Sequence, residues 1–126
     1  MSDAKPVVLV IDDSLVTVRA VEVLLSRAGY DVRSAGTGED GLRQAREALP
    51  RVILLDVELP DIDGYSVCRR LKDDSRTAGI PVILCTSRGE ALDEADRAGV
   101  QAHAYLPKPF SPSALRDLVT RFTAEG

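Results

Sequence analysis

The chain has 126 residues, of which 44% are hydrophobic and 29% are charged, a balance typical of one soluble globular domain. Sixteen Lys and Arg against twenty Asp and Glu give a net charge of −4, which argues against electrostatic binding to nucleic acid. A single histidine, His103, excludes histidine-rich metal sites, and no apolar run approaches the roughly 18 residues of a membrane span.

The first strand is predicted at Val7–Ile11, a continuous apolar run of the kind that is buried on both faces of a parallel sheet. An amphipathic helix follows over Ser14–Ala28, and Gly29 supplies the left-handed residue that ends many helices. Apolar positions recur along this helix at Val18, Val21, Leu25 and Ala28. A weaker strand is predicted at Asp31–Ala35.

The second helix is predicted to begin after Thr37, in an acidic variant of the capping box, and to end before Pro50. Its apolar face consists of Leu42, Ala45 and Leu49. The run Val52–Leu55 repeats the pattern of a buried strand. A third helix is predicted to bury Tyr65, Cys68 and Leu71.

Another buried strand is predicted at Val82–Cys85, and a weaker one at Ala102–Leu106. Between them a fourth helix, closed by Gly99, has the apolar positions Ala91, Leu92, Ala95 and Ala98. The last helix is predicted to begin at Ser111 with Pro112 in its first turn. Its apolar stripe consists of Leu115, Leu118, Val119 and Phe122.

A strand followed by a helix, five times over, predicts an α/β fold of the doubly wound (βα)5 type, a five-stranded parallel sheet with helices on both faces. We expect residues 1–126 to form one domain, with a core from about Val7 to Phe122. Ligands of such sheets bind beyond the carboxyl ends of the strands. The polar residues at those ends are therefore the candidates for a functional site.

Asp12, Asp13 and Asp56 follow two of the strong strands, and Thr86 and Lys108 follow two others. Three carboxylates in one crevice repel one another unless a cation neutralises them, and Mg²⁺ prefers such hard oxygen ligands. A lysine and a hydroxyl beside the cation could hold phosphoryl oxygens. The group predicts phosphoryl transfer onto a carboxylate, with Asp56 as the nucleophile because its strand is expected to be central.

Each of these residues also has an ordinary structural interpretation. Asp12 and Asp13 could cap the first helix, where acidic groups are favoured by the helix dipole. Asp56 could be a loop acid, Thr86 a helix cap and Lys108 a solvated surface charge. We expect His103 to be a packing or surface residue on the fifth strand.

The two cysteines lack the spacing of metal ligands, and a chain of this size needs no disulfide. Cys85 is expected to act as a small hydrophobic residue at the end of its strand. The N-terminal residues show no charged segment followed by an apolar run, which a secretion signal would have. We therefore expect a protein of the reducing cytoplasm with no membrane partner.

Four segments resemble the signature segments of receiver domains of two-component response regulators, in particular the single-domain chemotaxis type: Leu9–Ser14, Leu54–Gly64, Pro81–Ser87 and Tyr105–Phe110. The resemblance runs from about Val7 to Phe122. It implies a flavodoxin-like three-layer sandwich with strand order 2-1-3-4-5. It also implies a cis peptide at Lys108–Pro109.

The same resemblance implies a role for each residue of the group. Asp56 would accept a phosphoryl group from a histidine kinase or a histidine phosphotransfer protein. Mg²⁺ would be bound by Asp13, Asp56 and the backbone carbonyl of Glu58, with Asp12 acting mainly through water. Lys108 would pair with phosphoryl oxygens. Thr86 would swing in to bond one of them.

Tyr105 would follow Thr86 inward, and this movement would change the surface formed by the fourth helix, the fifth strand and the fifth helix. The result would be a signalling switch that controls a protein partner and catalyses only its own phosphorylation and dephosphorylation. Kinase choice would depend on residues of the first helix such as Leu15, Val16 and Arg19. The domain would be a monomer or a phosphorylation-dependent dimer.

Glu58 and Arg88 depart from the usual family pattern. They either form an ion pair that modulates the site or are two independent exposed charges. Two other functions are weighed against the switch. A phosphatase of the haloacid-dehalogenase type would place its nucleophile on the first strand and need a substrate cap, and a degenerate scaffold would not need the full set of residues.

Overall fold

Five parallel strands form one sheet in the order β2-β1-β3-β4-β5, the order expected from the resemblance. The computed structural model describes residues 5–86 and 102–123 of the chain. In chain order the strands are β1 (Val7–Ile11), β2 (Asp31–Ala35), β3 (Val52–Asp56), β4 (Val82–Thr86) and β5 (Ala104–Pro107). The predicted α/β class is confirmed.

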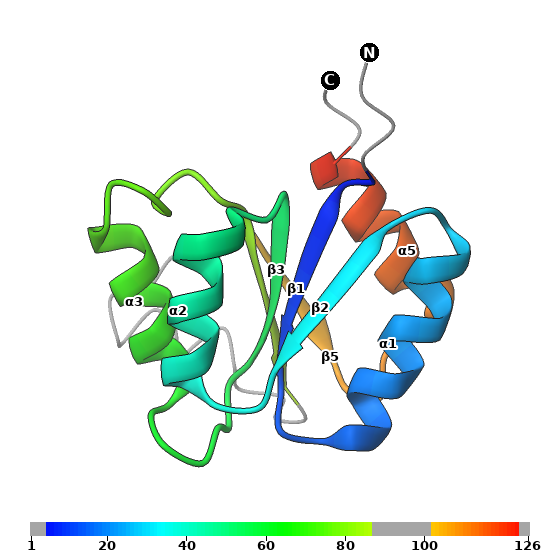
Figure 1. Cartoon of the computed structure of the whole chain (residues 1–126). Coiled ribbons are helices and arrows are strands. Elements are labelled where there is room, and N and C mark those ends of the chain that lie inside the picture. The colour runs from blue at the N-terminus through cyan, green and yellow to red at the C-terminus, as the bar shows by residue number, and fades with distance from the viewer. Residues whose placement is uncertain (1–4, 87–101, 124–126) are drawn as a thin grey trace.

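Helices cover both faces of the sheet (Figure 1). One face carries α2 (Gly38–Ala48) and α3 (Gly64–Asp73), and the other carries α1 (Leu15–Arg27) and α5 (Pro112–Thr123). The helix predicted around residues 91–98, and with it Arg88, lies outside the described residues. Each helix in the described part of the chain is too short or too polar to span a bilayer.

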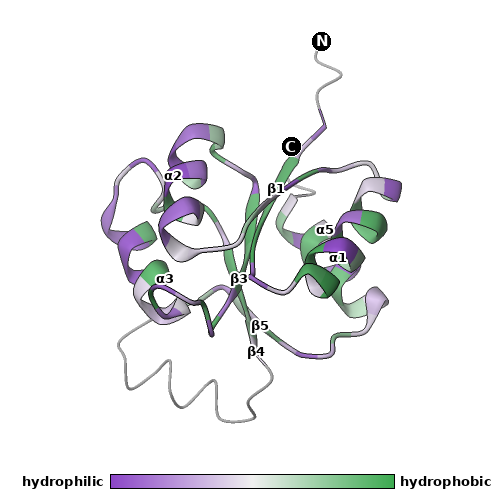
Figure 2. Ribbon diagram, turned by 60° about the horizontal axis from the view of Figure 1, so that its bottom comes forward, coloured by the Kyte–Doolittle hydropathy of each residue, from purple (hydrophilic) through white to green (hydrophobic). Residues whose placement is uncertain are grey.

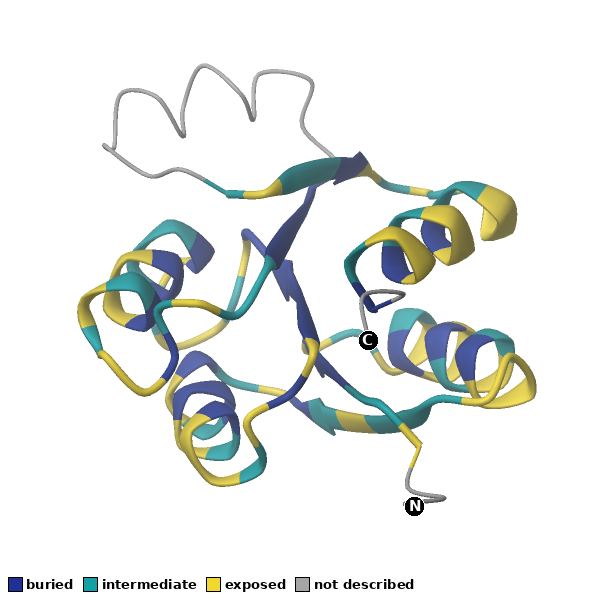
Figure 3. Cartoon of the chain, turned by 90° about the horizontal axis from the view of Figure 1, so that it is seen from above, coloured by how far each residue is buried: buried dark blue, intermediate teal, exposed yellow. Residues whose placement is uncertain are grey.

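The alternation of strand side chains divides the core into two clusters, one on each face of the sheet. Leu9, Ile53 and Leu84 pack toward α2 and α3, whereas Val10 and Leu54 pack toward α1 and α5. Figure 3 shows the buried sides of the helices turned toward the buried central strands. The continuous apolar runs β1, β3 and β4 are thus the strands covered on both faces.

Local capping explains where the helices begin and end. Ser14 and Thr37 are the N-caps of α1 and α2, and each accepts a hydrogen bond from a backbone N–H three residues ahead. Gly29 follows α1 with φ of 99°, as predicted, and Leu49 ends α2 with φ of 47°. That left-handed turn directs Leu49 to solvent, so its predicted place on the apolar face is wrong, as is that of Ala28.

Four strand ends differ from the predicted bounds, one of them the end of β5, which is Pro107 instead of Leu106. Asp56 and Thr86 are the last residues of β3 and β4 rather than the first residues after them, and β5 begins at Ala104 instead of Ala102. Parallel pairing still brings all carboxyl ends to one edge, at the bottom of Figure 1. Figure 2, where this edge is turned forward, shows hydrophobic strands running between helices with hydrophilic segments.

Candidate functional site

Three carboxylates from two neighbouring strands meet at the carboxyl edge of the sheet. Asp12 and Asp13 directly follow β1, and Asp56 ends β3, which lies beside β1. One oxygen of each side chain lies within 4.8 Å of the others. Asp12 and Asp56 are buried and Asp13 is exposed, so the cluster has a buried floor and an open side.

Lys108 supplies the positive charge of this cluster. Its ammonium lies 2.6 Å from a carboxylate oxygen of Asp12 and 3.5 Å from one of Asp56. Its backbone N–H donates to the carbonyl of Thr86 at 2.8 Å, and its peptide bond to Pro109 is cis, as the resemblance implied. Only 19% of the Lys108 side chain is exposed, so its interpretation as a solvated surface charge is wrong.

The electrostatics of the cluster are dominated by burial. Burial, and next the neighbouring charge of Asp12, raise the pKa of Asp56 above its usual value, although Lys108 and the backbone N–H of Glu58 partly oppose the shift. Burial also works against the charge on Lys108, but the hydrogen bond to Asp12 and the attraction of both carboxylates leave its pKa raised. The site therefore gathers more negative charge than its one lysine neutralises.

The helix-cap interpretation of Asp12 and Asp13 is also wrong, because the N-cap of α1 is Ser14. Asp12 instead accepts the Ser14 N–H at 2.9 Å on one oxygen and binds Lys108 with the other. The Ser14 bond fixes the orientation of the Asp12 carboxylate toward the cluster. This local bond is a detail that the strand-end pattern did not reveal.

Thr86 and Tyr105 lie on adjacent strands and on the same face of the sheet. Tyr105 pairs with Leu84 in the register of β4 and β5, which makes Thr86 its diagonal neighbour. Thr86 is buried, whereas Tyr105 is half-buried and packs against the cluster under α2 and α3. The register therefore brings together the two residues that the resemblance links.

The segment from the end of β3 to the first residue of α3 contains residues whose contribution the sequence did not reveal. Gly64 packs so closely that a Cβ there would lie 2.3 Å from the Asp56 carbonyl oxygen, and its N–H donates to Val57 at 2.7 Å. Asp61 accepts two backbone hydrogen bonds from the first turn of α2. Glu58 is exposed in the same loop, whereas its proposed partner Arg88 lies outside the described residues.

Cys85, on β4, and His103, before β5, do not belong to the carboxylate cluster. Burial raises the pKa of the Cys85 thiol to about 12, so it remains protonated and acts as the small hydrophobic residue that was expected. His103 precedes β5 instead of lying on it, at the amino end of the sheet. Its Nδ1 accepts the Val82 N–H at 3.2 Å, which makes it a structural residue.

The donor set fits a hard divalent cation. Three carboxylates within reach of one another, two of them buried, offer the oxygen ligands that Mg²⁺ prefers, and the exposed side leaves room for water or phosphate oxygens. The raised pKa of Asp56 has the same implication, because a bound cation would relieve the repulsion from Asp12.

Comparisons with known proteins agree with this geometry. Residues 8–120 match the response regulator receiver domain family. The chain is 42% identical over 105 residues to the DNA-binding dual master transcriptional regulator RpaA of Synechocystis sp., which covers 83% of this chain and 44% of that protein. It is also 42% identical over 104 residues to the transcriptional regulatory protein AfsQ1 of Streptomyces coelicolor, with 82% and 45% covered. The chain spans about half the length of these curated relatives.

Solved structures show the same fold. The chemotaxis protein CheY4 of Vibrio cholerae superposes with a TM-score of 0.84 at 30% identity, covering 94% of this chain and 99% of that one. The receiver domain of the sensor histidine kinase PA1611 of Pseudomonas aeruginosa superposes with a TM-score of 0.87 at 27% identity, covering 97% and 100%. That structure has a magnesium ion coordinated in its active site cleft. The chain therefore belongs to the receiver domain family of two-component response regulators.

Proposed function

We propose that this domain takes a phosphoryl group onto Asp56 from a histidine kinase or a histidine phosphotransfer protein and thereby switches a surface that controls a protein partner. The observation that carries the proposal is the position of Asp56. Its carboxylate is buried at the end of a central strand, close to two further aspartates and 3.5 Å from the Lys108 ammonium. Family membership supports the same role.

Each residue of the cluster has a separate role in phosphoryl transfer. An Asp56 oxygen attacks the phosphorus of a phosphohistidine, and the P–N bond breaks as the P–O bond forms, with the electron pair left on the imidazole. Asp13, Asp56 and the backbone carbonyl of Glu58 would hold Mg²⁺ directly, and Asp12 through water. When bound, the cation offsets the negative charge of the phosphoryl oxygens.

Lys108 changes partner during this step. The new phosphoryl group adds about −1.5 to −2 charges. The Lys108 ammonium already lies between Asp12 and Asp56, so a small rotation turns it from the Asp12 carboxylate to a phosphoryl oxygen. The domain thus catalyses its own phosphorylation and dephosphorylation and acts as a signalling switch rather than as a metabolic enzyme.

The switch passes through Thr86 and Tyr105. The Thr86 hydroxyl bonds a phosphoryl oxygen, and Tyr105, its diagonal neighbour on the same face of the sheet, follows it inward. The phosphoryl group on Asp56 favours the switched state to the extent that its contacts there are stronger than those in the unswitched state. The changed surface includes β5 and α5, and the third element expected in it, the fourth helix of the sequence prediction, lies outside the described residues.

The phosphodonor docks beside the site along α1 and the start of α5. A groove of about 1040 Å³ opens there, and its wall includes Leu15 and Val16, each 82% exposed. A neighbouring hollow lined by Val16, Pro109 and Phe110 extends to Lys108 itself. This continuity would place a donor histidine at the open side of the carboxylate cluster. The setting of such an exchange is the cytoplasm.

Small-molecule phosphorylation tests the proposal. Incubation with phosphoramidate and Mg²⁺ should add one phosphoryl group to the intact mass of the protein, and Asp56→Asn should abolish the gain. Asp117→Asn, which removes an exposed carboxylate on α5, is the matched control and should phosphorylate like the wild type. An unchanged mass for the wild type, or an equal gain in Asp56→Asn, would contradict the proposal.

A further inference from the structure

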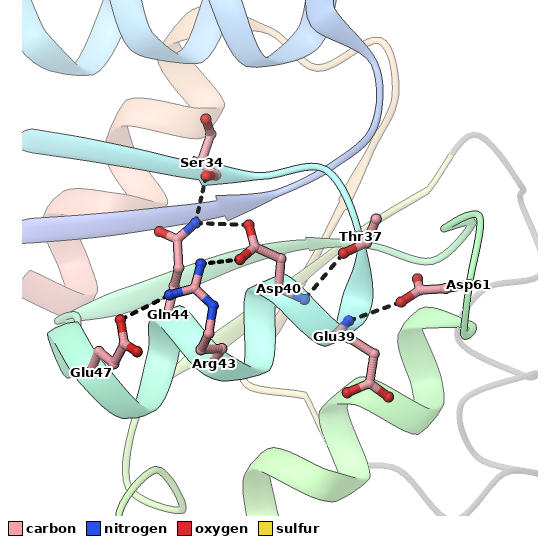
Figure 4. A network of polar contacts seen from close by, with 8 residues as sticks. All are labelled: Ser34, Thr37, Glu39, Asp40, Arg43, Gln44, Glu47 and Asp61. Atoms are coloured by element: carbon pink, nitrogen blue, oxygen red, sulfur yellow. Dashed lines mark hydrogen bonds and ion pairs between the residues drawn. The ribbon is translucent and has the colours of Figure 1, made fainter.

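Asp61 joins the loop that follows the candidate phosphoacceptor to a helix more than twenty residues earlier in the chain. One of its carboxylate oxygens accepts the Gly38 N–H at 2.8 Å, and the other accepts the Glu39 N–H at 2.9 Å. Figure 4 shows Asp61 reaching the start of α2 from the loop before α3. The side chain itself is exposed, so the bonds link two surface segments.

The same loop is held by close packing on both sides of Asp61. A Cβ on Gly38 would lie 2.4 Å from Ile62, so only glycine allows the loop to approach α2 this closely. At the end of the loop, the Gly64 N–H donates to Val57 at 2.7 Å. Glu58 lies between Val57 and Asp61 in this loop. Its backbone N–H donates to the Asp56 carboxylate and lowers the pKa of Asp56.

The two hydrogen bonds favour the ionised form of Asp61, which is the form that accepts them. The Glu39 and Gly38 N–H groups lower the pKa of Asp61, and the positive end of the α2 dipole favours the same ionised form. The α2 terminus has a separate cap of its own, since Thr37 accepts the Asp40 N–H at 3.1 Å. Asp61 is therefore not needed to begin the helix.

We propose that Asp61 is a positioning residue of the carboxylate cluster: by fastening its loop to α2, it sets the backbone of Glu58, and through it the Asp56 carboxylate, for cation binding. The inference rests on the proposed function, because it assigns Glu58 and Asp56 to the same cation site. Its contribution is indirect, since Asp61 lies outside the cluster of Asp12, Asp13 and Asp56.

Calorimetric titration with Mg²⁺ alone tests the inference. Asp61→Ala should raise the dissociation constant for Mg²⁺ about tenfold, the lower end of the loss that follows removal of an outer partner of a metal site. Thr37→Ala removes the other cap of the same helix end and leaves the loop attached. The Thr37→Ala protein should therefore bind Mg²⁺ like the wild type, although its free energy of unfolding is lower than that of the wild type.

The charge lost with Asp61 needs its own control. Asp74→Ala removes a carboxylate that likewise accepts a backbone N–H, but at the far end of α3. Repeating the titrations at about 0.5 M salt screens long-range attraction between charges. A positioning effect of Asp61 survives the salt, whereas an effect of charge alone does not.

Hydrogen exchange supplies a readout that does not depend on the metal. The Glu58 amide should exchange faster in Asp61→Ala than in Thr37→Ala, and Asp61→Asn, which keeps one acceptor oxygen, should fall between the wild type and Asp61→Ala. Equal Mg²⁺ affinity in Asp61→Ala and Thr37→Ala would overturn the inference, as would a loss that disappears in high salt. Failure of the proposed function would be seen separately, as a wild-type protein that gains no phosphoryl mass from phosphoramidate.

Discussion

The polar side chains at the amino end of the sheet and those at its carboxyl end have different kinds of partner. At the amino end, Tyr30 and Thr123 share a hydrogen bond of 2.9 Å, and His103 accepts the Val82 N–H. At the carboxyl end, Asp12, Asp13 and Asp56 gather in one cluster, and Lys108 contacts Asp12 and Asp56. The polar groups named at the first end have hydrogen-bond partners and include no cluster of like charges, whereas the second end retains repulsion between carboxylates that a bound cation would relieve. The difference marks the carboxyl end as the functional one.

Of the changes proposed for the two ends, the removal of Lys108 should have the largest effect on the free energy of unfolding. Lys108→Ala leaves Asp12 and Asp56 facing each other without a counter-charge, and we expect a loss of about 3 kcal/mol in the free energy of unfolding. Mg²⁺ should restore part of it by replacing the ammonium. Urea denaturation with and without Mg²⁺ measures both effects. Lys5→Ala, at an exposed lysine, is the control, and equal stability of the two variants would contradict the account of the cluster.

Two glycines, one at each end of the sheet, differ in how closely the surrounding atoms pack against them. Gly64→Ala forces a Cβ against the Asp56 carbonyl, so we expect a loss of about 2 kcal/mol and slower phosphorylation. Gly79 lies in the turn before β4, at the amino end, where an added Cβ meets nothing within 4 Å. Gly79→Ala should be neutral or slightly stabilising. Thermal unfolding of the pair measures the difference, and similar losses at both positions would count against close packing behind Asp56.

Asp56→Asn should stabilise the metal-free domain. Because the pKa of Asp56 is raised in the folded protein, its ionisation opposes folding, and the cost appears as pH rises above the usual carboxyl range. We expect the variant to gain about 1 kcal/mol at pH 7, and little near about pH 3, where both states are protonated. Urea denaturation at the two pH values measures this. A variant less stable than the wild type at neutral pH would show that the cluster is not strained.

The smallest effect concerns His103. Burial, and next the charge of Lys72, lower its pKa, so protonation opposes folding and its share of the stability is lost as pH falls below the ordinary histidine range. His103→Gln should flatten the decline in unfolding free energy between about pH 7 and 5. The same slope in both proteins would contradict the structural role of this imidazole.

The sequence predicted the carboxylate cluster well because each member occupies a strand end. Parallel strands bring their carboxyl ends to one edge, so a one-dimensional pattern was sufficient to gather Asp12, Asp56 and Lys108. The continuous apolar runs likewise predicted which strands are covered on both faces. In both cases the determining feature is local and repeats along the chain.

Other features depend on contacts that no local pattern contains. Asp61 accepts hydrogen bonds from backbone N–H groups of α2. Because nearly every residue type has such a group, the identities of Gly38 and Glu39 do not predict this contact. Leu49 fits the apolar period of α2, but the left-handed end of the helix turns it to solvent. The pairing of Lys108 with Asp12 follows from a distance of 2.6 Å that only the folded chain defines.

The position of the phosphoryl group is the most direct test of the central claim. An acyl phosphate is reduced by borohydride to an alcohol with release of phosphate, which converts the modified aspartate to homoserine. After phosphorylation with phosphoramidate and Mg²⁺, peptide mass mapping should find homoserine at position 56 and nowhere else. Homoserine at Asp12 or Asp13, or none in a protein that has gained phosphoryl mass, would contradict the assignment of Asp56.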